Sequence, residues 1–175
     1  MTRAVLSLGS NMGDRYAHLR AAVGCLADTV VLTSGVYETP PWGDAEQPAY
    51  LNAVVMAVDP GADPLVWLRR AQACEAAAGR VRDPARRFGP RTLDVDVIAV
   101  WTDDDVPVLR ADPDLTLPHP RAAQRAFVLK PWLDLQPYAQ FPGHGAVTDL
   151  LTTPELTAQA QALRPRTDLT LESTP

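Results

Sequence analysis

Cysteines and long apolar runs are both scarce in this sequence, which narrows the classes of protein that it fits. Its 175 residues include two cysteines, Cys25 and Cys74. Both fall in helical patterns, so we expect two buried thiols rather than a disulfide framework or a zinc site. No apolar run reaches the roughly 20 residues that span a bilayer, and the first residues do not resemble a signal peptide. We therefore predict a cytoplasmic protein with no membrane partner.

Positive charge is also in short supply, and much of it is concentrated in one segment. The formal net charge is -5, which argues against a nucleic-acid partner. Five arginines nevertheless lie between residues 80 and 91, and Asp83 is the one acidic residue among them. They are Arg80, Arg82, Arg86, Arg87 and Arg91. Because a planar guanidinium binds two phosphate oxygens at once, the segment is typical of a phosphate-binding loop. A solvated arginine-rich surface is the alternative.

A strand-like run with alternating aspartates follows the arginines directly. Asp94 and Asp96 alternate with Leu93, Val95 and Val97. In a strand the two carboxylates would point to one face, roughly 6.6 Å apart. Carboxylates at that spacing can bind a pair of Mg²⁺ ions, which lie about 3.5–4 Å apart in two-metal sites. The alternative is the ordinary solvent face of an antiparallel sheet. The neighbouring arginines favour a metal site, because Mg²⁺ and arginine together bind a polyphosphate.

The hydrophobic pattern predicts one α+β domain. Hydrophobic residues make up 46% of the chain, which is enough for a substantial core. Strands are expected at 4–8, 30–38, 50–58, 92–100 and 106–110, and helices at 14–27, 64–78, from Pro120 onwards and within 154–163. The leading β-α-β-β-α-β order predicts a ferredoxin-like core with an antiparallel sheet and extra helices. The domain is expected to span residues 1–163, followed by a flexible tail at 164–175.

Two further segments carry side chains suited to binding. Residues 39–49 connect two expected strands, are longer than a hairpin needs, and hold Trp42 beside two prolines. A substrate lid and a neutral insertion both explain that length. His119 lies between two prolines, where it is suited to contact a phosphate or a nucleobase, or to a structural role in a turn.

These segments occur in an order that resembles the hydroxymethyldihydropterin pyrophosphokinase family of folate biosynthesis. The resemblance covers residues 4 to about 151 and rests on several short motifs. They are Leu8-Gly9-Ser10-Asn11 with Gly13-Asp14-Arg15, Tyr37-Glu38-Thr39-Pro40-Pro41, Gln47-Pro48-Ala49-Tyr50-Leu51-Asn52, Gly79-Arg80-Val81-Arg82, residues 87–98, Pro118-His119-Pro120 and Arg125-Ala126-Phe127. Each motif is modest alone, but in this order they are highly specific.

The resemblance implies that ATP, as co-substrate, gives its β,γ-pyrophosphate to the hydroxymethyl group of a reduced pterin. It assigns catalysis to Arg80, Arg82, Arg91, Asp94 and Asp96, with Asp94 and Asp96 binding two Mg²⁺ ions. It assigns ATP binding to Gln72, Glu75, Arg82, Phe88, Arg91, Val97, His119 and Arg125. It assigns the pterin pocket to Gly9, Thr39, Pro40, Trp42, Tyr50, Asn52, Phe88 and Phe127. The expected protein is a monomer.

The chain departs from the family pattern at Phe88, where many members have tryptophan. Phenylalanine keeps an aromatic face but has no indole N–H to donate. Two other functions also fit parts of the sequence: a ferredoxin-like regulatory module that binds a small molecule without chemistry, and a two-metal nucleotidyl transferase. The regulatory module would not need the carboxylate pair, and the nucleotidyl transferase would release pyrophosphate instead of AMP.

Overall fold

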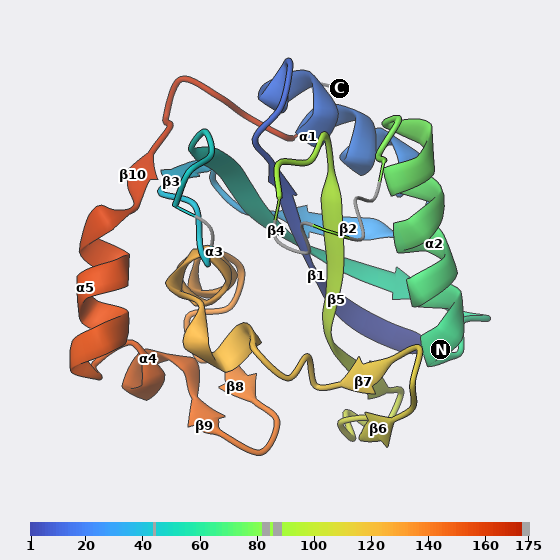
Figure 1. The fold of residues 1–175 in the computed structure, drawn as a ribbon. Coiled ribbons are helices and arrows are strands. Elements are labelled where there is room, and N and C mark those ends of the chain that lie inside the picture. The colour runs from blue at the N-terminus through green and yellow to red at the C-terminus, as the bar shows by residue number, and fades with distance from the viewer. Residues whose placement is uncertain (44, 82–84, 86–88, 173–175) are drawn as a thin grey trace.

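The chain forms a central antiparallel sheet with helices on both faces (Figure 1). The computed structural model describes residues 1–43, 45–81, 85 and 89–172. The sheet contains β1 (Thr2–Ser10), β2 (Val30–Thr33), β3 (Tyr37–Thr39), β4 (Tyr50–Asp59), β5 (Asp94–Thr102) and β10 (Arg164–Pro165). Its order is β10-β3-β4-β1-β5, and β2 also pairs with β4. The predicted α+β, ferredoxin-like arrangement is confirmed, because β1 lies between β4 and β5 as a split βαβ requires.

Two layers of helices bury the two faces of the sheet. One face packs against α1 (Arg15–Cys25) and α2 (Pro64–Ala77). The other packs against α3 (Ala126–Leu135), and α5 (Pro154–Ala162) packs against α3 in turn. The remaining elements are short: the 3-10 turn at Ala122–Gln124, α4 (Val147–Leu150), and the pairs β6 (Arg110–Ala111) with β7 (Thr116–Leu117) and β8 (Gln140–Phe141) with β9 (Gly145–Ala146). Successive strand residues point to opposite faces, so each long strand contributes to both cores.

Local sequence explains where the first two helices begin and end. The Asp14 carboxylate accepts a hydrogen bond from the Ala17 N–H and caps α1. Asp63 accepts from the Leu65 and Val66 N–H groups and caps α2, with Pro64 at the first helical position, as the sequence predicts. Gly79 follows α2 with a positive φ of 69°, a conformation that favours glycine at a helix end.

Three sequence expectations about secondary structure are corrected. The strand expected at 30–38 is divided into β2 and β3. Between them the Val54 N–H donates a hydrogen bond to the Ser34 hydroxyl oxygen, and this side-chain contact interrupts the backbone ladder. The strand expected at 106–110 is replaced by an isolated bridge at Pro107, which has no N–H to continue a ladder, and by the short β6, which begins at Arg110. The helix expected from Pro120 begins with a 3-10 turn, and α3 starts only at Ala126.

Two burial expectations also differ from the structure. Cys74 is buried, but Cys25 at the end of α1 is exposed. The segment expected as a loose tail from Arg164 is packed through residue 172: β10 pairs with β3, the Tyr16 hydroxyl donates to the Thr170 carbonyl at 2.6 Å, and Leu171 is 4% exposed. The apolar side chains of Leu169 and Leu171 join the core between α1 and the sheet, which offsets the entropy of ordering this segment.

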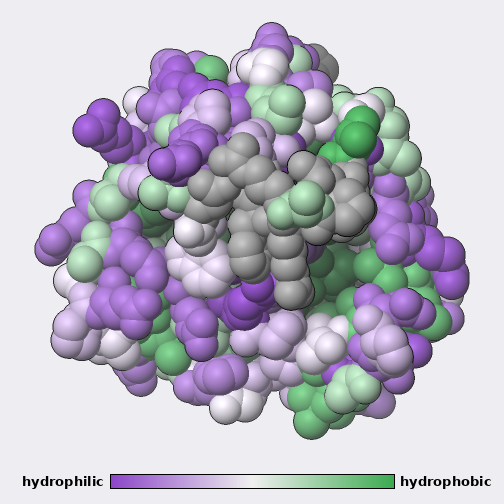
Figure 2. Space-filling model, in the orientation of Figure 1, coloured by the Kyte–Doolittle hydropathy of each residue, from purple (hydrophilic) through white to green (hydrophobic). Residues whose placement is uncertain are grey.

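One face of the molecule is mostly polar. Figure 2 shows hydrophilic residues over much of the visible face, with hydrophobic residues in separate patches. Exposed apolar side chains include Val31, Leu32, Val106 and Leu109. Within the described part of the chain, no helix combines the length and apolar character needed to cross a membrane.

Candidate active site

One face of the sheet changes from apolar to polar toward one end of three neighbouring strands. Residues two apart on a strand share a face, and the register aligns three such rows. They are Val5, Ser7 and Gly9 on β1, Val54 and Asn52 on β4, and Ile98, Asp96 and Asp94 on β5. The apolar members lie in the core beneath α3. The polar members extend beyond that core and line a cavity.

Gly9 lets the central strand pass close beneath a polar side chain. A Cβ at Gly9 would lie 2.8 Å from Asn52 Oδ1, closer than normal contact. The other end of the Asn52 amide is fixed as well, because Nδ2 donates to the Thr39 hydroxyl oxygen at 2.6 Å. Asn52 is 4% exposed, so its amide presents a defined donor and acceptor pattern at the floor of the cavity.

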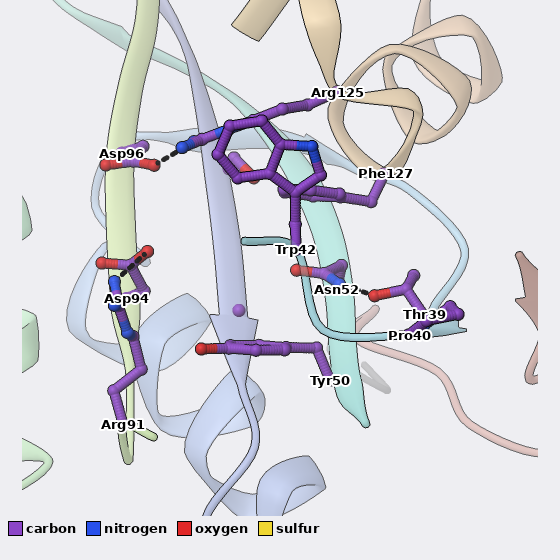
Figure 3. Close-up of a pocket in the computed structure, with 12 residues that line it drawn as sticks. Thr39, Pro40, Trp42, Tyr50, Asn52, Arg91, Asp94, Asp96, Arg125 and Phe127 are labelled. Carbon is purple, nitrogen blue, oxygen red and sulfur yellow. Dashed lines mark hydrogen bonds and ion pairs between the residues drawn. The ribbon is translucent and has the colours of Figure 1, made fainter. Parts of the chain in front are cut away.

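The first cavity lies over this floor and has aromatic walls (Figure 3). Its volume is about 50 Å³. The lining residues are Ser7, Gly9, Thr39, Pro40, Trp42, Tyr50, Asn52, Arg91, Asp94, Asp96, Arg125 and Phe127. The Arg125 guanidinium carbon lies 4.8 Å from the Trp42 ring centroid and 5.6 Å from that of Phe127. This cation–π arrangement holds the indole over the site.

A second, larger cavity of about 490 Å³ lies on the other side of the two aspartates. Its lining is mostly polar and comes from α2, β5 and the segment around β7 and His119. The residues include Leu68, Ala71, Gln72, Glu75, Arg80, Val95, Val97, Thr116, His119 and Arg121. Arg91, Asp94, Asp96 and Arg125 line both cavities. The carboxylate pair therefore stands at the boundary between two binding spaces.

Asp94 is held by two arginines. Arg80 Nη1 lies 2.6 Å from Asp94 Oδ1, and Arg91 Nη1 lies 3.1 Å from Oδ2. Burial alone would raise the pKa of this carboxyl group, but the charges of Arg91 and Arg80 together outweigh burial and lower the pKa. Asp94 is therefore ionised at neutral pH.

Asp96 has a different environment although it lies on the same face. Arg125 Nη1 is 3.2 Å from Asp96 Oδ2, and His119 Nε2 is 3.8 Å from the same oxygen. Burial and the negative charge of Asp94 raise the pKa of Asp96 to about 7. The two carboxyl groups thus titrate differently because they repel one another in a partly desolvated place.

His119 is neutral in this arrangement. Burial, with the charges of Arg125 and Arg121, lowers its pKa to about 4. The Arg121 N–H donates to His119 Nδ1 at 3.2 Å, so the proton of the neutral ring belongs on Nε2. That nitrogen faces Asp96 and lines the second cavity. His119 can therefore donate one hydrogen bond to an anion there without carrying charge.

Asn11 joins the loop of residues 40–49 to the arginine segment. Its Nδ2 donates to Gln47 Oε1 at 2.9 Å and to the Pro48 carbonyl at 3.0 Å. Its Oδ1 accepts from the Arg91 N–H at 2.8 Å, and its own N–H donates to the Arg91 carbonyl at 3.2 Å. Asn11 is 2% exposed. Two segments far apart in sequence are therefore fixed beside each other by one side chain.

The structure brings together every described residue that the sequence predicted for the site. Gly9, Thr39, Pro40, Trp42, Tyr50, Asn52 and Phe127 line the first cavity, and Gln72, Glu75, Arg80, Arg91, Val97, His119 and Arg125 line the second. The predicted residues Arg82 and Phe88 lie outside the described residues. Ser7 and Arg121 are among the lining residues that were not predicted from the sequence. Ser7 was detectable, because it lies two residues before Gly9 on the same strand; Arg121 gave no clear signal.

The donor set at the boundary suits Mg²⁺. Mg²⁺ takes oxygen ligands and is typically bound by one or two carboxylates together with substrate phosphates and water. Asp94 and Asp96 supply two such carboxylates, and their mutual repulsion would be offset by a divalent cation. Over the described ranges, no group of three or more His, Cys, Asp or Glu side chains is positioned to hold a metal ion. The remaining ligands would therefore come from phosphate oxygens and water.

The sequence matches a known family and several named relatives. Residues 5–137 match the family model described as 7,8-dihydro-6-hydroxymethylpterin-pyrophosphokinase (HPPK). The chain is 51% identical over 158 residues to a Mycobacterium tuberculosis protein named 2-amino-4-hydroxy-6-hydroxymethyldihydropteridine pyrophosphokinase; the match covers 86% of this chain and 83% of that protein. Proteins of the same name from Mycobacterium leprae (52% identity, 76% and 71% coverage) and Methylorubrum extorquens (47%, 78% and 84%) are also similar.

Solved structures show the same fold at much lower identity. A Plasmodium falciparum HPPK-DHPS triple mutant with STZ-DHP superposes with a TM-score of 0.66 at 12% identity. A wild-type structure of the same protein with pterin and p-hydroxybenzoate gives a TM-score of 0.64 at 14% identity. Each covers 94% of this chain, but this chain spans 46% of those longer chains. The likeness concerns the fold alone.

Proposed function

The chain belongs to the 7,8-dihydro-6-hydroxymethylpterin-pyrophosphokinase family, and we propose that the two adjoining cavities are its pterin and ATP sites. The reaction transfers the β,γ-pyrophosphate of ATP to the hydroxymethyl group of 6-hydroxymethyl-7,8-dihydropterin and releases AMP, as a step in folate biosynthesis. The assignment of the two sites rests on Asp94 and Asp96, because both residues line both cavities. A group that passes between two substrates must cross such a boundary.

The smaller cavity has the chemistry to bind a pterin. A pterin is flat and carries donors and acceptors along its edge, so aromatic faces and a fixed amide suit it. Trp42, Tyr50 and Phe127 supply rings, and Asn52 supplies the amide. The cavity of about 50 Å³ is far smaller than the roughly 300 Å³ at which ligand pockets begin. Trp42 must therefore move away from Arg125 when a bicyclic substrate enters.

The larger cavity has the chemistry to bind a nucleotide triphosphate. Gln72 and Glu75 of α2 and the N–H of His119 Nε2 offer polar contacts to the nucleoside and its phosphates. Arg80, Arg91 and Arg125 offer positive charge where the β- and γ-phosphates must lie. Family resemblance adds Arg82 and Phe88, which we propose as contacts to ATP, with Phe88 also facing the pterin.

Phosphoryl transfer needs little covalent catalysis by the protein, so positioning of the substrates and neutralisation of charge account for most of the rate enhancement. We assign Asp94 and Asp96 as ligands of two Mg²⁺ ions. When bound, Mg²⁺ would neutralise negative charge on the phosphate oxygens while the β-phosphorus exchanges its bond to the α-phosphate oxygen, which leaves on AMP, for a bond to the hydroxyl oxygen of the pterin. Arg80 and Arg91 already contact Asp94, so they are placed to share their remaining donors with the transferring phosphate. No side chain is needed as a covalent intermediate.

We also propose that the chain acts as one pyrophosphokinase domain, as a monomer in the cytoplasm and without a nucleic-acid partner. The acidic net charge of -5 supports the absence of a nucleic-acid partner. Light scattering at the concentration used for assays tests the monomer.

The deciding experiment follows the products from ATP, Mg²⁺ and 6-hydroxymethyl-7,8-dihydropterin. Formation of AMP with the pterin pyrophosphate supports the assignment. Release of inorganic pyrophosphate would indicate a nucleotidyl transferase instead. Binding of both compounds without turnover would indicate a regulatory module.

A further inference from the structure

Arg15, the first residue of α1, contacts both stems of the loop that carries Trp42. Its Nη1 donates to the Ala49 carbonyl at 2.9 Å, and its Nη2 donates to Glu38 Oε2 at 2.8 Å. Glu38 belongs to β3, before the loop, and Ala49 is the last residue before β4. One guanidinium therefore ties the entry and the exit of residues 40–49 to the start of a helix.

The two stems carry several of the side chains that form the pterin-side cavity. Thr39 and Pro40 follow Glu38 directly, and Tyr50 follows Ala49; all three line that cavity. Thr39 also pairs with Tyr50 across the strands and accepts the Asn52 amide hydrogen bond. Arg15 and Glu38 line neither cavity. Their influence on a substrate must therefore pass through the backbone positions that they hold.

The ion pair between Arg15 and Glu38 contributes too little free energy to be explained as a means of stabilising the fold. The side chains of Arg15 and Glu38 are 27% and 28% exposed, and ion pairs that solvent reaches contribute on the order of 0–1 kcal/mol. The direction of these contacts matters more than their energy, because one arm of the planar guanidinium donates to the Ala49 carbonyl and the other to the Glu38 side chain, which relates the two stems to each other.

We propose that Arg15 is a positioning residue for the pterin site, which acts through Glu38 and the Ala49 carbonyl to set the spacing of Thr39 and Tyr50. The inference rests on the proposed function, since it assigns the smaller cavity to the pterin. Asn11 still holds the middle of the loop at Gln47 and Pro48. Loss of Arg15 therefore displaces the stems without releasing the loop.

The test compares pterin binding with ATP binding in Arg15→Ala. Titration calorimetry measures the Kd of 6-hydroxymethylpterin in the presence of Mg²⁺ and a non-hydrolysable ATP analogue, and the Kd of the analogue alone. Steady-state assays give the two KM values and kcat. Because Arg15 would act only by displacing Thr39 and Tyr50, we expect the pterin Kd and KM to rise about tenfold, which corresponds to roughly 1.4 kcal/mol of binding free energy. The Kd of the analogue should stay within about twofold.

Arg70 provides a matched control. Its side chain is also 27% exposed, and it also bridges two segments, through Asp59 at 2.9 Å and Asp28 at 3.1 Å. It lines neither cavity. Arg70→Ala should change the melting temperature without changing the pterin Kd. A similar loss of pterin affinity in both variants would overturn the proposal, because it would mean that general loosening accounts for the effect.

Further variants keep the test decisive if Arg15→Ala folds poorly. Glu38→Gln removes the charge with little change in size and should reproduce part of the loss. Arg15→Lys keeps the charge but cannot hold both stems, so it should not restore affinity. Arg166→Ala should have less than about a twofold effect, because Arg166 Nη1 lies 3.6 Å from Glu38 Oε2, beyond a hydrogen bond.

The failure of this proposal is distinct from failure of the proposed function. If the parent protein does not bind the pterin, the assignment of the cavity is wrong. If the parent binds it and the folded Arg15→Ala and Glu38→Gln variants bind it equally well, the assignment of the cavity stands and the role of Arg15 is refuted.

Discussion

The Glu75 carboxylate on α2 accepts a hydrogen bond from the Val95 N–H at 3.0 Å. Val95 lies between Asp94 and Asp96, so this contact holds the strand at the point where both carboxylates leave it. The same Glu75 oxygen contacts Arg80, which in turn contacts Asp94. Glu75 is 6% exposed. A residue predicted for ATP binding thus also supports the segment that carries the proposed metal ligands.

We predict that Glu75→Ala destabilises the protein and impairs catalysis together. A buried N–H left without an acceptor costs about 1–3 kcal/mol, which corresponds to roughly 2–12 °C in melting temperature for a domain of this size. Glu75→Gln keeps an oxygen that can accept from Val95 and should retain most of the stability. Thermal unfolding of both variants, beside AMP formation, decides this. Equal stability of the two variants would show that the Val95 contact is dispensable.

Asp94→Ala and Asp96→Ala should each leave a folded protein with almost no transfer activity. Loss of a ligand to the cation at a phosphoryl centre should raise the barrier by several kcal/mol, and each 1.4 kcal/mol or so is tenfold in rate. AMP formation at saturating Mg²⁺ is the measurement, with circular dichroism as the control for folding. Near-normal turnover of either variant would rule out the proposed metal role of that residue.

Trp42→Ala should weaken pterin binding about tenfold or more, whereas Trp42→Phe should be tolerated. The indole contributes a stacking face, which is worth roughly 0.5–1.5 kcal/mol beyond the area it buries. Phenylalanine keeps a face, and alanine removes it. Fluorescence or calorimetric titration with 6-hydroxymethylpterin measures the difference. Tighter binding by Trp42→Ala would mean that the indole chiefly obstructs the cavity.

Tyr37 should resist ionisation at alkaline pH. Its hydroxyl contacts the Asp134 carboxylate at 2.9 and 3.1 Å, and burial together with that negative charge raises the pKa of Tyr37. A raised folded pKa contributes stability that is fully present below the unfolded value near 10 and is lost as pH rises toward the folded value. Up to about pH 11, Tyr37→Phe and the parent protein should therefore show the same phenolate absorbance at 295 nm. A smaller rise in absorbance for the variant than for the parent below that pH would contradict the burial argument.

Truncation after Leu163 should destabilise the protein, in contrast to the behaviour of a loose tail. It removes the β10–β3 pair and the buried Leu171. Burial of one leucine contributes about 1.5–3 kcal/mol, so the melting temperature should fall by roughly 3–12 °C. Truncation after Glu172 keeps these contacts and should match the parent. If the two truncated proteins unfold at the same temperature, the packing of the last segment adds no stability.

Several local features of this protein were predictable from its amino-acid sequence. The alternation of aspartates with apolar residues predicted that Asp94 and Asp96 lie on one face of a strand, because neighbouring strand residues point to opposite sides. Asp63 with Pro64 and Gly79 marked the ends of α2 through capping chemistry. The order of short motifs identified the family, and with it the residues that line the two cavities.

Contacts between segments that are distant in sequence were not predictable, and the tertiary structure was needed to find them. It set Ser7 beside Asp96 through the β1–β5 register, gave Glu75 a backbone partner on β5, and brought Arg15 to both stems of the loop. It also packed residues 164–172, which are mostly polar but bury Leu171 and partly bury Leu169. The physical reason is that such contacts depend on strand register and helix packing. Both minimise the free energy of the whole chain and leave no periodic signal in any one segment.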